Sequence, residues 1–101
     1  DKREFFVWRT IMETRIAVIS MILENASCAE RVNAILHEYG ECVIGRMGIP
    51  YRQKGVHIIS VAVDAPPNLI SALSGKLGRI QGVSLKTAYS AAQGGEPCAK
   101  S

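Results

Sequence analysis

The pattern of apolar and polar positions divides the chain into six segments, four with the periodicity of strands and two with that of helices. Residues 15–23 are almost continuously apolar, with Ser20 as the one polar interruption, which predicts a strand covered on both faces. Residues 42–49 and 56–64 predict two further strands, joined by a turn over 50–55, and Pro50 is expected to end the first of them. Residues 83–90 alternate cleanly and predict an edge strand with one face in water.

Two segments between these strands have the period of amphipathic helices. Ser27 and Glu30 form an S-x-x-E capping box, so Ser27 is predicted to cap the first helix, and Gly40 is predicted to end it in a left-handed conformation. Its apolar stripe consists of Cys28, Val32, Ile35, Leu36 and Tyr39. The second helix is predicted to begin at Pro66 and Pro67, with an apolar face of Leu69, Ile70, Leu73, Leu77 and Ile80.

The resulting order, β-α-β-β-α-β, predicts an α+β fold of the ferredoxin-like type. Two helices would cover one face of a four-stranded antiparallel sheet. We expect this domain to span residues 12–90, with a flexible tail over 91–101. Residues 1–11 are interpreted as a leader, because Trp8 and Arg9 can be encoded by a ribosome-binding sequence ahead of Met12, or as an aromatic arm that packs on the domain or on a partner.

Composition restricts the class of protein. The chain has 101 residues, 48% of them apolar and 21% charged, which suits one small globular domain. Its net charge of +3 does not call for nucleic acid, and no apolar run is long enough for a transmembrane helix. Cys28, Cys42 and Cys98 are too few and too scattered for a disulfide framework, so we expect a cytoplasmic protein in which Cys28 and Cys42 lie in the core.

No catalytic constellation is present in the sequence, so we expect a protein that is not an enzyme and carries no cofactor. His37 falls on the polar side of the first helix and is expected to be exposed. His57 and Cys42 are of the residue types that bind zinc or nickel, but hairpin counting places Cys42 opposite Val63, far from His57. A metal site would therefore require donors from a second chain.

The hairpin between the second and third strands has an unusual composition. Two glycines, Gly45 and Gly48, predict a bulge or a close backbone approach. Arg46, Arg52 and Lys54 make the hairpin basic, with no acid between them. Either an anion or an acidic partner binds here, or the charges only keep the turn soluble and guard the edge against pairing.

Four stretches resemble a known family of small bacterial proteins, the regulators of the iron-only hydrogenase system. They are METRIAVIS (12–20), ILHEYG (35–40), IGRMGIPY (44–51) and ISALSGKLGRIQGVSLKTAYS (70–90). The resemblance implies an ACT-like ferredoxin fold, similar to the regulatory domain of nickel-responsive transcription factors. Those factors use several histidines and a DNA-binding arm. The chain has only His37 and His57 and no such arm, so neither metal binding nor direct nucleic-acid binding is expected.

Two classes of function follow from this resemblance. The favoured one is a non-catalytic regulatory domain that oligomerises and binds a small ligand or a protein partner. The alternative is a metal-responsive regulator whose metal site is shared between subunits. ACT domains imply a ligand site at the exit of the first strand, where helix N–H groups attract anions. The candidate ligand-binding residues are Asn25, Ala26, Ser27, Arg46, Tyr51 and Arg52.

The first strand also predicts self-association, because both of its faces are apolar. Ile16, Val18 and Ile22 lie on one side, and Ala17, Ile19, Met21 and Leu23 on the other. Helices can cover only one of these sets, and the third strand repeats the pattern. We therefore expect a homo-oligomer, a dimer or tetramer, built through the sheet and without contact to a membrane. The alternative is that residues 1–11 cover the second face within a monomer.

Overall fold

The strands and helices predicted from the hydrophobic pattern form in the predicted order. The computed structural model describes residues 13–91, so the predicted leader or arm and all but the first residue of the predicted tail lie outside the described residues. The elements are β1 (Arg15–Leu23), α2 (Ala26–Glu38), a 3₁₀ turn η1 (Gly40–Cys42), β2 (Val43–Tyr51), β3 (Val56–Ala65), α3 (Pro67–Gly78) and β4 (Val83–Tyr89).

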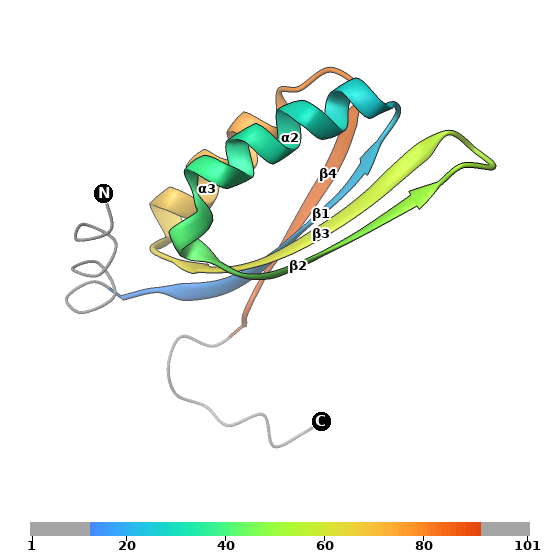
Figure 1. Ribbon diagram of the computed structural model, residues 1–101. Coiled ribbons are helices and arrows are strands. Elements are labelled where there is room, and N and C mark those ends of the chain that lie inside the picture. The colour runs from blue at the N-terminus through green and yellow to red at the C-terminus, as the bar shows by residue number, and fades with distance from the viewer. Residues whose placement is uncertain (1–12, 92–101) are drawn as a thin grey trace, which may run out of the picture.

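The four strands form one antiparallel sheet in the order β2-β3-β1-β4. Both helices lie on the same face of this sheet (Figure 1). The fold is therefore the α+β, ferredoxin-like arrangement that the sequence predicts, and β4 is an edge strand as expected. No helix in the stretch 13–91 is both long and apolar enough to cross a bilayer.

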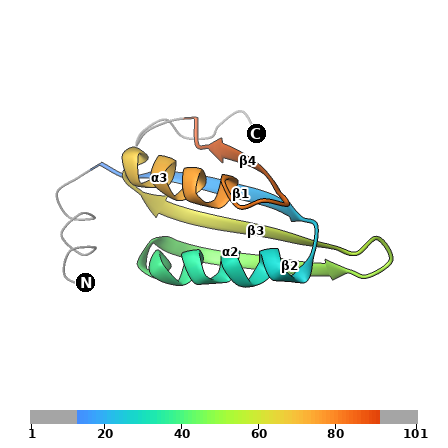
Figure 2. The same cartoon turned by 90° about the horizontal axis from the view of Figure 1, so that it is seen from above.

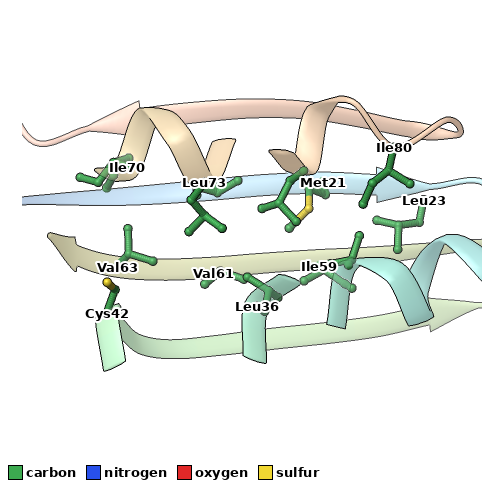
Figure 3. Packing of buried hydrophobic residues seen from close by; sticks show 14 of the residues in the cluster. Met21, Leu23, Leu36, Cys42, Ile59, Val61, Val63, Ile70, Leu73 and Ile80 are labelled. Atoms are coloured by element: carbon green, nitrogen blue, oxygen red, sulfur yellow. The ribbon is translucent and has the colours of Figure 1, made fainter. Parts of the chain in front are cut away.

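The core lies between the helices and one face of the sheet. On β1, Ala17, Ile19, Met21 and Leu23 are at most 1% exposed, and they alternate with exposed residues along the strand. Leu36 of α2 and Leu73 of α3 point toward the same layer as Val61 of β3 (Figure 3). Each large side chain buried in this way stabilises the fold by about 1.5–3 kcal/mol. Cys28 and Cys42 both lie in this core, as predicted.

Each helix covers one half of the sheet. α2 lies above the side of β2 and β3, and α3 above the side of β1 and β4 (Figure 2). A hydrogen bond from Arg46 Nη2 to Asn33 Oδ1 (2.7 Å) joins β2 to α2. The hydroxyls of Ser74 and Thr87, 3.0 Å apart, join α3 to β4. These bonds fix the two helices over the strands that they cover.

The two helices contact each other through a lysine, an aromatic ring and a carboxylate. Lys76 Nζ lies 5.1 Å from the centre of the Tyr39 ring and 3.8 Å from Glu38 Oε1. Tyr39, and to a smaller extent Glu38, raise the pKa of Lys76 above its ordinary value. The lysine is exposed, so this contact orients the helices without contributing much to stability.

The first helix begins two residues earlier than its capping box predicts. Asn25 has extended backbone angles, and its Oδ1 accepts a hydrogen bond from the backbone N–H of Cys28 (3.1 Å). The predicted Ser27 cap is wrong: Ser27 lies inside the first turn and donates its hydroxyl to Asn25 Oδ1 (2.7 Å). Asparagine is as good an N-cap as serine, and here its side chain reaches the third N–H of the helix.

Two further predictions about chain breaks are wrong. Gly40 does not have a positive φ, because the chain continues from Tyr39 into the 3₁₀ turn η1, closed by a bond from Cys42 N to Tyr39 O (2.9 Å). Pro50 does not end its strand. It lies within β2, paired with His57. This is possible because β2 is an edge strand, which has a strand partner on one side only, so the N–H group that proline lacks is not required by a second neighbour.

The glycine-rich hairpin contains the predicted irregularity. The register of β2 against β3 shifts between Val43 and Gly45, as a β-bulge requires. Val43, rather than Cys42, is the residue opposite Val63, a difference of one position from the hairpin count. His57 pairs with Pro50 near the turn, about 20 Å along the strand from Val63, so the predicted separation of Cys42 from His57 is confirmed.

Candidate interaction surface and ligand site

The sheet has a second face that no helix or strand among residues 13–91 covers (Figure 1). Side chains that alternate with the core residues point to it. On β1, Val18 is 38% and Ile22 is 51% exposed, whereas Ile19, between them, is 0% exposed. The large apolar residues that are exposed on this open face are Ile16, Val18, Ile22, Met47, Ile49 and Tyr51.

The open face thus carries Ile16, Val18 and Ile22, the second apolar side that the sequence predicts for the first strand. Its charges lie at the margins: Lys86 is on the edge strand β4, and Asp64 lies near the end of β3. At its centre the hydroxyls of Ser20 and Ser60 are 3.3 Å apart and bond to each other. A largely apolar face whose charged groups lie at the rim is typical of an interaction surface.

One part of the open face is hollowed. A cavity of about 390 Å³ lies over β3, β1 and β4 and is almost entirely apolar. Its walls come from Ser20, Met21, Ile22, Ile58, Ser84, Leu85 and Lys86. The hollow can accept an apolar side chain or a small apolar molecule, with Lys86 as its one charged group.

The loop between β1 and α2 lines a different, polar cavity of about 290 Å³. Asn25 and Ser27 form one wall, together with Glu24 and Cys28, and Gln81 and Gly82 of the loop before β4 form the opposite wall. The two loops are held together by a bond from Glu24 N to Gly82 O (2.9 Å) and by the Cys28 thiol, which donates to Gln81 O (3.2 Å). This cavity contains two of the three ligand residues that the ACT resemblance implies, and Ala26 lies between them.

Charges of both signs line the polar cavity. Arg31, one turn into α2, supplies a guanidinium, and Glu24 supplies a carboxylate. The first turn of α2 adds the positive end of the helix dipole, although Asn25 already occupies the N–H of Cys28. The arrangement suits a small molecule that carries a carboxylate or another anionic group.

The six candidate ligand residues do not form one site. Asn25, Ala26 and Ser27 lie at the start of α2. Arg46 lies on the helix side of β2, bonded to Asn33, whereas Tyr51 is on the same side of β2 as Ile49, on the open face. Arg52 is in the hairpin turn. The three candidate residues of the hairpin, Arg46, Tyr51 and Arg52, are therefore divided between the two faces of β2 and the turn.

The sequence-based interpretation missed five residues of the polar cavity: Glu24, Cys28, Arg31, Gln81 and Gly82. Arg31 lies four residues after Ser27, so helical spacing could have placed it beside the predicted site. Gln81 and Gly82 are far away in sequence, and only the pairing of β1 with β4 brings them there.

Metal-binding residue types are dispersed over the part of the chain that the structure describes. His37 is exposed on α2, as predicted, and His57 and Cys42 lie at opposite ends of the β2–β3 hairpin. No three His, Cys, Asp or Glu residues within 13–91 are grouped so that they could hold an ion. A single subunit thus offers the metal-responsive alternative no donor set over these residues.

The sequence of the folded part also places the chain among known proteins. Residues 15–87, from the start of β1 nearly to the end of β4, match the family described as TM1266-like, "Iron-only hydrogenase system regulator, putative". The chain belongs to this family. The resemblance found in the sequence is confirmed, and it covers both helices, all four strands and the polar cavity.

A solved structure agrees with this membership in the TM1266-like family. The chain is similar to the protein TM1266 from Thermotoga maritima, with 37% sequence identity and a TM-score of 0.72. The similarity covers 76% of this chain and 98% of that chain. No curated protein sequence matches the chain. The TM1266-like family description names a regulator and no reaction.

Proposed function

We propose that the protein is a non-catalytic regulator of the iron-only hydrogenase system that acts by self-association and by binding a ligand or a partner protein. The family description supports the iron-only hydrogenase system as the system that this protein regulates. The observation that carries the mechanism is the apolar open face of the sheet. We expect the protein in the cytoplasm, where reduced cysteines such as Cys28 and Cys42 are the rule.

Self-association through the open face follows from the energetics of apolar surface. Two strands, β1 and β2, contribute six large apolar side chains that are each at least 38% exposed. Apolar area gains about 25 cal/mol per Å² when it leaves water, so covering this face is favourable by several kcal/mol before the entropy of association is subtracted. A second copy offers an identical apolar face, and symmetric pairing of one surface with itself is the commonest form of oligomer.

A ligand site in the polar cavity would allow a small molecule to regulate this oligomer. The start of α2 attracts an anion, and Arg31 provides a charge partner for a carboxylate. Because the cavity is formed by the β1–α2 loop and the loop before β4, a ligand there contacts the ends of two strands that also form the open face. Binding at the cavity and pairing of the sheets can therefore influence each other.

The oligomer is tested by replacing Val18 with lysine. The wild-type chain is expected to show twice the monomer mass, or four times, by light scattering at micromolar concentration, because the open face is covered by another copy. Val18→Lys places an ammonium group at the centre of that face and should yield a folded monomer. Ser71→Lys, on the exposed side of α3, is the matched control and should leave the mass unchanged.

A monomeric wild-type protein would contradict the oligomer. A version that begins at Met12 tests the alternative that residues 1–11 cover the open face: if only this shorter chain associates, these residues cover the face in the full chain.

The regulatory role is tested in cells. Cells that lack the protein should have altered iron-only hydrogenase activity. Wild type should restore it and Val18→Lys should not. Unaltered activity would contradict the proposed role.

The ligand site is tested by titrating the labelled protein with amino acids and with nucleotides while amide signals are followed by NMR. Shifts are expected to cluster at Asn25 to Cys28 and at Gly82, because these residues line one cavity. Arg31→Ala should weaken the binding of an anionic ligand about tenfold, the effect of losing one charge-assisted hydrogen bond. Shifts confined to the hairpin or to α3 would remove this site from the proposal.

A further inference from the structure

Large and small side chains are arranged in separate rows on the open face, so its shape is more specific than that of a uniform apolar patch. The strand register aligns side chains into rows that run across β2, β3 and β1. One row, the isoleucine ridge, consists of Ile49, Ile58 and Ile22. A second row, the low row, consists of Gly45, Ala62 and Val18. Each residue of the low row lies four positions from a ridge residue on the same strand, about 13 Å away.

A middle row lies halfway between the ridge and the low row. It consists of Met47, Ser60 and Ser20 and continues to Lys86 on the edge strand β4. The hydroxyls of Ser20 and Ser60 bond to each other, so this hydrogen bond is kept when the face is covered. Lys86 is at the outer end of this row, where a long side chain can reach water while its stem is covered.

We infer that a second copy of the chain pairs with the open face across a two-fold axis that runs along the middle row. Such an axis turns each strand back onto the same strand of the other copy. It places Ile58 on Ala62, Ile49 on Gly45 and Ile22 on Val18, so the isoleucine ridge of each copy fills the low row of the other. The inference rests on the self-association proposed above and adds its register.

Other symmetric arrangements fit this relief less well. An axis parallel to the strands, between β1 and β3, would place Ile58 against Ile22 and Ala62 against Val18. Ridge would then meet ridge, and the low rows would enclose voids, whose lining loses dispersion contacts. The axis along the middle row fills these voids and also brings Val18 of the second copy toward the apolar hollow beside Ile22. It keeps the strands of the two sheets close to antiparallel, within the range of aligned sheet packing.

The size of the face suits a specific interface. Four strands about 4.8 Å apart and about 30 Å long give on the order of 500 Å² per copy, or about 1,000 Å² in total. This is near the lower limit for a stable protein–protein contact. Association is therefore expected to depend strongly on how well the ridge and the low row fit.

The register is tested by exchanging a ridge residue with a low-row residue in the same chain. Ile58→Ala leaves a gap, and Ala62→Ile places isoleucine against isoleucine; each should weaken the dimer on the order of a hundredfold, since both copies carry the change. The double variant I58A/A62I should associate within a few-fold of wild type. The two-fold axis places position 58 on position 62, so each contact is again one isoleucine on one alanine.

The matched control is I22A/A62I, which carries the same two types of substitution. In the inferred register Ile22 lies on Val18 and not on Ala62, so this double variant should stay as weak as the worse of its single variants. Dissociation constants come from sedimentation, and circular dichroism on dilute samples shows that each variant is folded. Wild-type association without rescue by I58A/A62I, or with equal rescue by I22A/A62I, would overturn the register and leave the sheet-paired oligomer standing. A monomeric wild type would overturn both.

Discussion

Ile19→Lys is expected to unfold the domain, although the same change at the neighbouring Val18 leaves it folded. Ile19 is on the central strand β1 and is 0% exposed, facing the core between the two helices. A lysine there must bury an ammonium group without a partner and also loses the apolar contacts of isoleucine. The expected loss is about 4–5 kcal/mol, a large part of the 5–15 kcal/mol that stabilises a domain of this size.

Urea unfolding followed by circular dichroism measures this loss directly. Val18→Lys is the matched control, because it places the same group one residue away on the opposite face of the same strand. Under dilute conditions its midpoint should lie near that of wild type. If Ile19→Lys unfolds within a few tenths of a molar of wild type, the assignment of the buried face is wrong.

Gly82→Ala is expected to cost about 2–4 kcal/mol of stability, for two separate reasons. Gly82 has a φ of +94°, where a side chain strains the backbone. A Cβ at this position would also lie 2.7 Å from Cys28 Sγ, which is buried and bonded to Gln81 O. The loop before β4 must therefore shift, or the sulfur must leave its site.

Two variants separate these causes. Gly55→Ala has a similar positive φ of +66° but no atom within 4 Å of the new Cβ, so it should lose only the backbone part, about 1 kcal/mol. Cys28→Ala removes the sulfur, so Gly82→Ala made in that background should cost about as little as Gly55→Ala. Thermal unfolding gives all four values. An equal loss for Gly82→Ala with and without Cys28 would show that the close approach has no effect.

The strands and helices could be predicted from the sequence because they depend on local periodicity. The stripe from Cys28 to Tyr39 and the alternation of β1 repeat over several turns or residue pairs, so each position supports the others. The open face followed from the same argument: two apolar faces on β1 cannot both be covered by helices that lie on one side of the sheet.

Single-residue signals were less informative. Asn25 and Ser27 are both good capping residues two positions apart, and only the backbone conformation decides between them. Pro50 ends a strand in most settings, but here β2 is an edge strand, and this depends on the order of all four strands. Arg31 and Gln81 meet at the polar cavity through long-range pairing, which no local pattern in one sequence specifies.

The two buried cysteines make each end of the domain chemically observable. Cys28 lies where β1 ends and β4 begins, at the polar cavity, and Cys42 lies beside Val43 and Val63 at the opposite end of the sheet. Both side chains are 2% exposed, so an alkylating reagent reaches each sulfur only when that end opens. Their two labelling rates thus report separate opening free energies, and the ligand proposed for the polar cavity is expected to slow the labelling of Cys28 first.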